Sequence, residues 1–312
     1  MSKYEPLPGR DFPRFSSIKT FFRLPHVDLT DDYELGIVGV PFDGGVSYRP
    51  GARFGPTRIR EMTSLGRVYN WGRHQSFIEK IKVADLGDCP TVPIDINKSY
   101  ERIESYFSEV LKHDKKFIAV GGDHSTTLPL LRAVKKKLGK PVTLLHFDAH
   151  LDTYPAAWGC EYHHGAFVRH AVDEGLIDPA KSHQFGIRGP LAGASDLDFV
   201  QKHKINVHTV DDIRREGIFE FVKKLPEFNS DPVYISFDID CLDPAFAPGT
   251  GTPVPGGLTT YETQQILRAF KIKDLVACDL VEVCPPFDQS EITSLAALDC
   301  IFEFIGLFAA SK

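Results

Sequence analysis

Positive charge is scarce in this sequence. It has 36 lysine and arginine residues against 42 aspartate and glutamate residues, so its formal net charge is -6. A nucleic-acid-binding surface needs clustered positive charge to neutralise phosphates. The only dense cationic run is Lys135–Lys137, which we interpret as the solvated face of a helix. We therefore expect no nucleic-acid partner.

Long hydrophobic runs are also missing. No uninterrupted apolar run approaches the roughly 18 residues that a membrane span needs, and the proline-punctuated N-terminus has no apolar signal-peptide core. No Cys-x-x-Cys pair is present, which is typical of reduced thiols. The six cysteines are Cys89, Cys160, Cys241, Cys278, Cys284 and Cys300. We expect a cytoplasmic protein with no membrane partner and no disulfide framework.

Two common enzyme motifs are absent. The sequence has no Gly-x-Ser-x-Gly segment, which argues against a serine hydrolase. The pair Gly44-Gly45 is not followed by the Gly-Lys-Ser/Thr ending of a phosphate-binding loop. Neither a nucleophilic serine nor a phosphate cradle is therefore expected.

The composition is that of an ordinary folded protein, with 42% hydrophobic and 25% charged residues in 312 positions. No internal repeat, low-complexity stretch or linker divides the chain, so we predict one catalytic domain over residues 31–312. Residues 1–30 contain Phe21, Phe22 and Leu24, which is too apolar for a free tail. We expect this leader to pack on the body or on a neighbouring subunit.

Short apolar segments alternate with segments of helical spacing, which favours an α/β fold. The predicted strands are 36–40, 116–120, 142–147, 184–187, 233–237 and 275–281. The predicted helices are 100–112, 126–138, 218–224 and 260–270. This order predicts three layers, α-β-α, with helices on both faces of a central, mostly parallel sheet.

Polar clusters follow three of these strands, where ligands bind in open parallel sheets. Alternate residues of an extended chain project to one side, so the residues of each cluster are expected to face the same space. The pooled candidate metal ligands are His124, Asp148, His150, Asp152, Asp238 and Asp240.

Several desolvated carboxylates would repel one another unless a cation neutralised them. Six ligands are too many for one tetrahedral ion, so two divalent ions with bridging carboxylates fit better. Oxygen-rich ligands favour Mn²⁺, with Ni²⁺, Co²⁺ or Zn²⁺ as alternatives. Two such ions would activate a water molecule as the nucleophile. The competing interpretation is that the Asp-x-Asp segments are helix caps or turns.

Three segments resemble the metal motifs of the ureohydrolase family of arginases, agmatinases and related amidinohydrolases: Gly121–Ser125, Phe147–Asp152 and Ser236–Pro244. The resemblance covers nearly the whole chain and implies the arginase/deacetylase-like fold. It assigns one ion to His124, Asp148, Asp152 and Asp238, and the other to Asp148, His150, Asp238 and Asp240.

The same resemblance implies two further roles. His164 would be the proton shuttle and Glu282 the carboxylate that binds the guanidinium group. A planar cation pairs well with a bidentate carboxylate, and a leaving amine needs a proton from a group that titrates near neutrality. The competing interpretations are a framework histidine and a buried salt bridge.

The substrate tail is harder to assign. The loop Thr153–Tyr162 is apolar and acidic, so it offers little to the α-carboxylate of arginine. We assign Glu161 and Trp158 to substrate binding, with agmatine, converted to putrescine and urea, as the leading substrate. A solvated Glu161 is the competing interpretation. Similarity to guanidinobutyrase and proclavaminate amidinohydrolase leaves 4-guanidinobutyrate, another guanidino acid or guanidine as alternatives.

Two rival classes follow from the same residues. A metal-dependent deacetylase with a single zinc ion shares the implied fold, but it would not need His124, Asp152 and Asp240 as additional ligands. A silent binding subunit would have lost ligands, and none is missing. The resemblance also implies a homo-oligomer, either a trimer or a hexamer.

Overall fold

The computed structural model describes residues 3–311 and is built around one eight-stranded sheet with the order β4-β1-β5-β10-β9-β6-β7-β8. Every neighbouring pair in this sheet is parallel. The strands are β1 (Leu35–Val40), β4 (Val83–Asp88), β5 (Lys116–Gly121), β6 (Thr143–Phe147), β7 (His183–Ile187), β8 (Asn206–Thr209), β9 (Val233–Asp238) and β10 (Leu275–Val281). A short antiparallel hairpin joins β2 (Tyr69–Asn70) to β3 (Gln75–Ser76).

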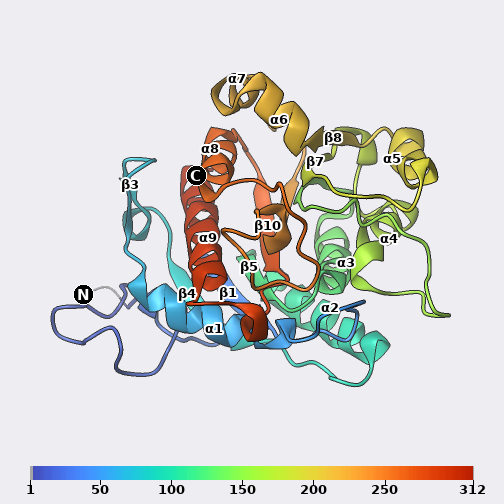
Figure 1. Cartoon of the computed structure of the whole chain (residues 1–312). Helices are drawn as coiled ribbons and strands as arrows, with labels where there is room; N and C mark the ends of the chain where they lie inside the picture. Colours follow the sequence, from blue (N-terminus) through green and yellow to red (C-terminus); the bar gives the residue numbers. More distant parts are fainter. Residues whose placement is uncertain (1–2, 312) are drawn as a thin grey trace.

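Helices cover both faces of the sheet (Figure 1). They are α1 (Gly55–Met62), α2 (Ile96–Lys112), α3 (Thr127–Leu138), α4 (Phe167–Asp173), α5 (Asp198–His203), α6 (Val210–Glu216), α7 (Ile218–Lys223), α8 (Thr260–Ala269) and α9 (Ile292–Ala310). Each face of the sheet has its own hydrophobic core, and consecutive strand residues point to opposite faces. Ile37 belongs to the core that includes residues of α1, α8 and α9, whereas Val38 belongs to the core that includes residues of α2, α3 and α4. The predicted three-layer α/β fold is confirmed.

All six predicted strands and all four predicted helices are present, with ends shifted by a few residues. The two edge strands, β4 and β8, were not predicted from the sequence. Edge strands are buried on fewer sides, so β8 is only half-buried and lacks the continuous apolar run of a central strand. Helix α9 was not predicted either, because it is apolar nearly all round and shows no amphipathic period.

Helix α9 has the length and composition of a membrane span, but most of it is buried inside the protein. Its buried Glu303 accepts hydrogen bonds from Arg73 Nε at 3.0 Å and from Arg268 Nη2 at 2.7 Å. Because a buried charge needs partners, these contacts fasten the β2–β3 hairpin and α8 to α9. The helix therefore forms part of the core.

The leader packs against the body of the same chain. Phe21, Phe22 and Leu24 are buried in the core on the α9 side of the sheet. The amide of Phe21 donates to Asp85 of β4 at 2.8 Å, and that of Phe22 donates to Thr63 at 2.9 Å. The division into a leader and a catalytic domain stays a prediction.

The four central strands, β5, β10, β9 and β6, lie side by side. Because they are parallel, their carboxyl ends meet at one edge of the sheet. The residues that follow them are therefore neighbours in space although they span more than half of the chain.

Candidate metal centre and active site

A single imidazole nitrogen lies at the centre of the first ligand group. His124 follows β5, and its Nδ1 is 3.1 Å from Asp148 Oδ2, 3.1 Å from Asp152 Oδ2 and 3.2 Å from Asp238 Oδ2. None of these approaches has hydrogen-bond geometry, so the buried Nδ1 has no hydrogen-bond partner. Three carboxylate oxygens around one orphaned nitrogen are the donor atoms that a divalent cation would satisfy.

A second group adjoins the first. His150 Nδ1 lies 3.2 Å from Asp148 Oδ1 and 3.2 Å from Asp240 Oδ2. Asp148 thus turns one oxygen toward each histidine, as a bridging carboxylate would. Asp238 turns Oδ2 to His124, whereas its Oδ1 accepts the amide of Asp240 at 2.8 Å. The structure brings all six predicted ligands together.

The electrostatics of this cluster also fit bound cations. Burial raises the pKa of Asp238 well above its usual range, and the neighbouring charges of Asp240 and Asp148 add to the effect. Divalent ions would replace this repulsion with attraction. The donor set, mostly carboxylate oxygen with two imidazole nitrogens, suits a pair of such ions.

Sequence reasoning missed a buried carboxylate that orients His124. His124 Nε2 lies 2.9 Å from Ser236 Oγ, and Ser236 donates to Asp279 Oδ1 at 2.7 Å. Asp279 Oδ2 also accepts from Tyr234 at 2.6 Å and from Thr127 at 2.9 Å. The Ser236 hydroxyl hydrogen is donated to Asp279, so Ser236 Oγ can only accept a hydrogen bond from His124 Nε2–H. The lone pair of His124 Nδ1 is therefore free for an ion.

A signal for this network was present in the sequence. Tyr234, Ser236 and Asp238 are alternate residues of β9 and therefore project from the same face. The partner Asp279 lies on the adjacent strand, where it pairs in register with Ser236. Only the strand order could reveal this pairing.

His146 is a second residue that sequence reasoning missed. It is fully buried, and its Nε2 lies 2.9 Å from Asp148 Oδ2. Gln184 Nε2 donates to His146 Nδ1 at 2.9 Å and to the carbonyl oxygen of Leu151 at 2.8 Å. Both ring nitrogens therefore have protein partners, so His146 holds Asp148 in place and is less available as a ligand.

Arg188 supports the other side of the centre. Its guanidinium group donates to the carbonyl oxygens of Asp240 at 2.8 Å, Cys241 at 3.0 Å and Leu242 at 3.1 Å. Five N–H donors in a planar fork suit such a cluster of carbonyl groups. The turn that carries Asp240 is fixed in this way.

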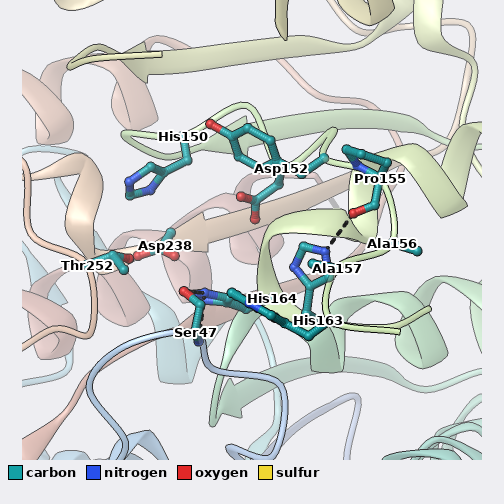
Figure 2. A pocket seen from close by; sticks show the side chains of 12 residues that line it. Ser47, His150, Asp152, Pro155, Ala156, Ala157, His163, His164, Asp238 and Thr252 are labelled. Atoms are coloured by element: carbon teal, nitrogen blue, oxygen red, sulfur yellow. Dashed lines mark hydrogen bonds between the residues drawn. The ribbon is translucent and has the colours of Figure 1, made fainter. Parts of the chain in front are cut away.

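A cavity of about 350 Å³ opens beside the ligands. Figure 2 shows His150 and Asp152 along one wall and Ser47 and His164 along the other. Twelve residues line it: Ser47, His150, Asp152, Tyr154, Pro155, Ala156, Ala157, Trp158, His163, His164, Asp238 and Thr252. The metal centre therefore faces a pocket large enough for a small molecule.

The substrate loop forms the outer wall of the cavity. His163 Nε2 donates to the carbonyl oxygen of Pro155 at 3.0 Å (dashed line in Figure 2), which ties the loop to the segment before His164. Trp158 lines the cavity but is 79% exposed. Glu161 is exposed and does not line the cavity, so its predicted contact with substrate has no support from the geometry.

Glu282 and His164 contact each other beside the centre. His164 Nδ1 lies 3.0 Å from Glu282 Oε1, which also accepts the amide of His124 at 2.9 Å. Burial lowers the pKa of His164, but the hydrogen bond and charge of Glu282 outweigh it and raise the pKa to about 9. Glu282 Oε2 is buried without a partner, so one oxygen remains to accept a hydrogen bond.

Two residues of the site have a left-handed backbone conformation. Glu282 has φ 67° and Asp152 has φ 51°, and nine other non-glycine residues of the described chain also have positive φ. A left-handed conformation at a residue other than glycine costs about 1–3 kcal/mol. Glu282 is held there because its amide donates to Gly122 at 2.8 Å.

The chain was compared with known proteins. Residues 33–306 match the model of the arginase family. The chain is 42% identical to proclavaminate amidinohydrolase of Streptomyces clavuligerus, covering 95% of each chain. A solved structure of that enzyme superposes with a TM-score of 0.89, covering 96% of this chain and 100% of the other.

Two further relatives carry other names. The chain is 40% identical to guanidinopropionase of Pseudomonas aeruginosa, with coverage of 98% of this chain and 96% of the relative. It is 42% identical to agmatinase of Cronobacter sakazakii, with coverage of 94% of each. The chain therefore belongs to the arginase family, whose members are binuclear-metal hydrolases that act on guanidino and amidino groups.

Proposed function

We propose that this enzyme hydrolyses agmatine to putrescine and urea, and that 4-guanidinobutyrate, another guanidino acid or guanidine is the alternative substrate. The observation that carries the guanidino assignment is the orphaned Oε2 of the buried Glu282. A planar cation with several N–H donors would satisfy this oxygen. No other described side chain in the site offers an unpaired buried carboxylate oxygen away from the ligand cluster.

His164 and Glu282 would have different roles in the reaction. Glu282 would accept hydrogen bonds from the guanidinium group and hold its carbon beside the metal centre. Glu282 is buried behind His164 and is not among the residues that line the cavity. His164, which does line it, would deliver a proton to the leaving amine. When bound, two divalent ions would activate the attacking water near neutral pH.

For the cofactor we propose two Mn²⁺ ions, with Ni²⁺, Co²⁺ or Zn²⁺ as alternatives. His124, Asp148, Asp152 and Asp238 would hold one ion. Asp148, His150, Asp238 and Asp240 would hold the other. The contacts of His124 and His150 support this division, and metal analysis of the purified protein tests it.

The cavity favours a substrate whose tail is not an anion. No lysine or arginine is among the twelve side chains, all from the described part of the chain, that line it. A carboxylate tail would therefore find no lysine or arginine partner at the cavity wall. The ammonium tail of agmatine could instead lie on the ring of Trp158 by a cation–π contact.

The three relatives are 40–42% identical to this chain, so identity does not rank their substrates for it. The test is urea release from agmatine, 4-guanidinobutyrate, arginine and guanidine, with Mn²⁺-loaded and Ni²⁺-loaded samples. We expect agmatine to be the best substrate. A preference for 4-guanidinobutyrate would contradict the cavity argument, and no urea from any compound would favour the deacetylase or silent-subunit alternatives.

We also propose a cytoplasmic homo-oligomer, either a trimer or a hexamer. Six free cysteines, five of them buried, support a reducing environment. Exposed apolar side chains in the leader, including Phe15 and Ile18, would suit a subunit contact. Light scattering of the purified protein measures the number of subunits.

A further inference from the structure

Ser47 lies against His164 on the cavity wall. Its hydroxyl oxygen is 2.7 Å from His164 Nε2, and its backbone amide donates to the same nitrogen at 3.2 Å. Both residues line the cavity, where Figure 2 shows them side by side. Ser47 is therefore a direct partner of the histidine that we propose as the proton donor.

The segment that carries Ser47 is fixed to the site on two sides. The amide of His164 donates to the carbonyl oxygen of Gly45 at 2.9 Å. The amide of Gly45 donates to Asp123 Oδ2 at 2.7 Å. These bonds hold the Ser47 backbone in register with His164, so the hydroxyl contact belongs to an ordered arrangement.

Glycine is needed at position 45. A Cβ atom there would lie 2.7 Å from Ser125 Oγ and 2.9 Å from Ser125 Cβ, which is too close for an unstrained contact. The Gly44-Gly45 pair, which does not belong to a phosphate-binding loop, thus permits the segment to approach the strand end that carries His124. This close approach of the Gly44-Gly45 segment places Ser47 beside His164.

The two neighbours of His164 determine which nitrogen carries its proton. Ionised Glu282 only accepts hydrogen bonds, so the contact at 3.0 Å places a proton on His164 Nδ1. The Ser47 amide only donates, so Nε2 is an acceptor in the neutral ring. His164 Nε2 is therefore the nitrogen that gains and loses a proton, and it lies next to the hydroxyl of Ser47, a residue that lines the cavity.

We propose that Ser47 is a catalytic residue that relays the proton from His164 to the leaving amine, an inference that rests on the proposed function. The Nε2–H bond of the imidazolium breaks as a new bond forms to Ser47 Oγ. The original Ser47 hydroxyl proton moves to the amine nitrogen as the bond from that nitrogen to the guanidino carbon breaks. Neutral His164 is recharged by a proton from the water that the reaction consumes.

The test compares Ser47→Ala, Ser47→Thr and the control Ser195→Ala, which removes an exposed hydroxyl outside the cavity. Ser47→Ala should lower kcat by about 10- to 100-fold, at the lower end of the range for general acid–base catalysis, with KM within about twofold and metal content unchanged. Ser47→Thr keeps the hydroxyl and should restore most of kcat. A kcat of Ser47→Ala within twofold of wild type, or a change in KM alone, would overturn the proposal.

A second readout does not depend on turnover. In the Zn²⁺-loaded protein with ¹⁵N-labelled histidine, assigned with the His164→Ala variant, Ser47→Ala should shift the Nε2 resonance of His164 more than its Nδ1 resonance. If the wild type releases no urea, the proposed function fails while this shift still reports the Ser47 contact. An unchanged Nε2 resonance would overturn the relay whatever the activity, and thermal melts of both Ser47 variants identify a folding defect.

Discussion

Two histidine clusters in this molecule have opposite characters. At the carboxyl ends of the central strands, His124 Nδ1 faces three carboxylate oxygens and has no hydrogen-bond partner. On β7 and β8, the last two strands at one side of the sheet, His183 Nδ1 and His208 Nε2 lie 2.9 Å apart and hydrogen-bond to each other. We call these two residues the edge pair. Burial lowers the pKa of both histidines of the edge pair, that of His183 to about 4.

The difference shows what marks a cation site. In the edge pair two neutral rings share one hydrogen bond, in which one ring donates and the other accepts. This contact needs no cation. The ligands of the central cluster are four buried carboxylates and only two imidazole rings, so protonating the rings would not neutralise the carboxylates. Surplus buried carboxylates around an orphaned nitrogen, and not histidines as such, identify the metal centre.

The largest effect is expected from removing a shared ligand. Asp148→Ala or Asp238→Ala should abolish turnover and lower the bound metal from two ions per chain to one or none. His183→Gln at the edge pair should leave metal content unchanged and turnover within about twofold. Elemental analysis and urea release measure both quantities, and full activity of either aspartate variant would refute a two-ion centre.

The next largest effect concerns His164, which contacts Glu282 but no carboxylate of the ligand cluster through a hydrogen bond. His164→Ala should lower kcat by about 10²- to 10⁴-fold, the range of general acid–base catalysis. Its metal content should equal that of the wild type. Reduced metal occupancy would instead identify His164 as a ligand.

A smaller effect should follow from Asp279→Asn, which keeps the size of the side chain but gives it an N–H donor. Ser236 would lose a charged acceptor, and His124 would no longer be held in one tautomer. Such outer partners change metal affinity by about 10- to 100-fold. Competition with a coloured chelator measures the affinity for Zn²⁺, and an unchanged Kd would show that Asp279 serves packing alone.

The smallest effect concerns the pH dependence of the edge pair. The folded pKa of His183, about 4, lies below its ordinary value of 6.5, so protons bind the unfolded state more readily. Its stabilising contribution is complete above about pH 6.5 and is lost as the pH falls toward 4. Allowing for partial exposure, the loss should be about 1 kcal/mol.

Denaturant unfolding of metal-free wild type and His183→Gln at pH 7 and pH 4 tests this expectation. Both proteins lose stability in acid for other reasons, but the wild type should lose about 1 kcal/mol more than the variant. Equal losses would mean that His183 is protonated without cost in the folded protein. Removing the metal beforehand keeps its release out of the comparison.

Several features were predictable because they depend on local pattern. Central strands such as β5 contain a continuous apolar run, here Phe117–Val120, because helices cover them on both faces. The candidate ligands Asp148, His150 and Asp152 follow β6 and converge as expected, but the predicted extended backbone does not continue through them. The chain bends at residues 149 and 150, and Asp152 has φ 51°, so the position after a central strand brings them together. Edge strand β8 and the apolar helix α9 have no such local signature, and both were missed.

The sequence by itself determined which polar residues follow which buried strands, and hence which carboxylates converge on the two histidines. Only the tertiary structure decided the contacts that tune them. Asp279 reaches His124 through Ser236 because β10 pairs with β9, and Ser47 reaches His164 across 117 positions of the chain. Such pairings depend on strand order and loop packing, which periodicity along one chain does not encode.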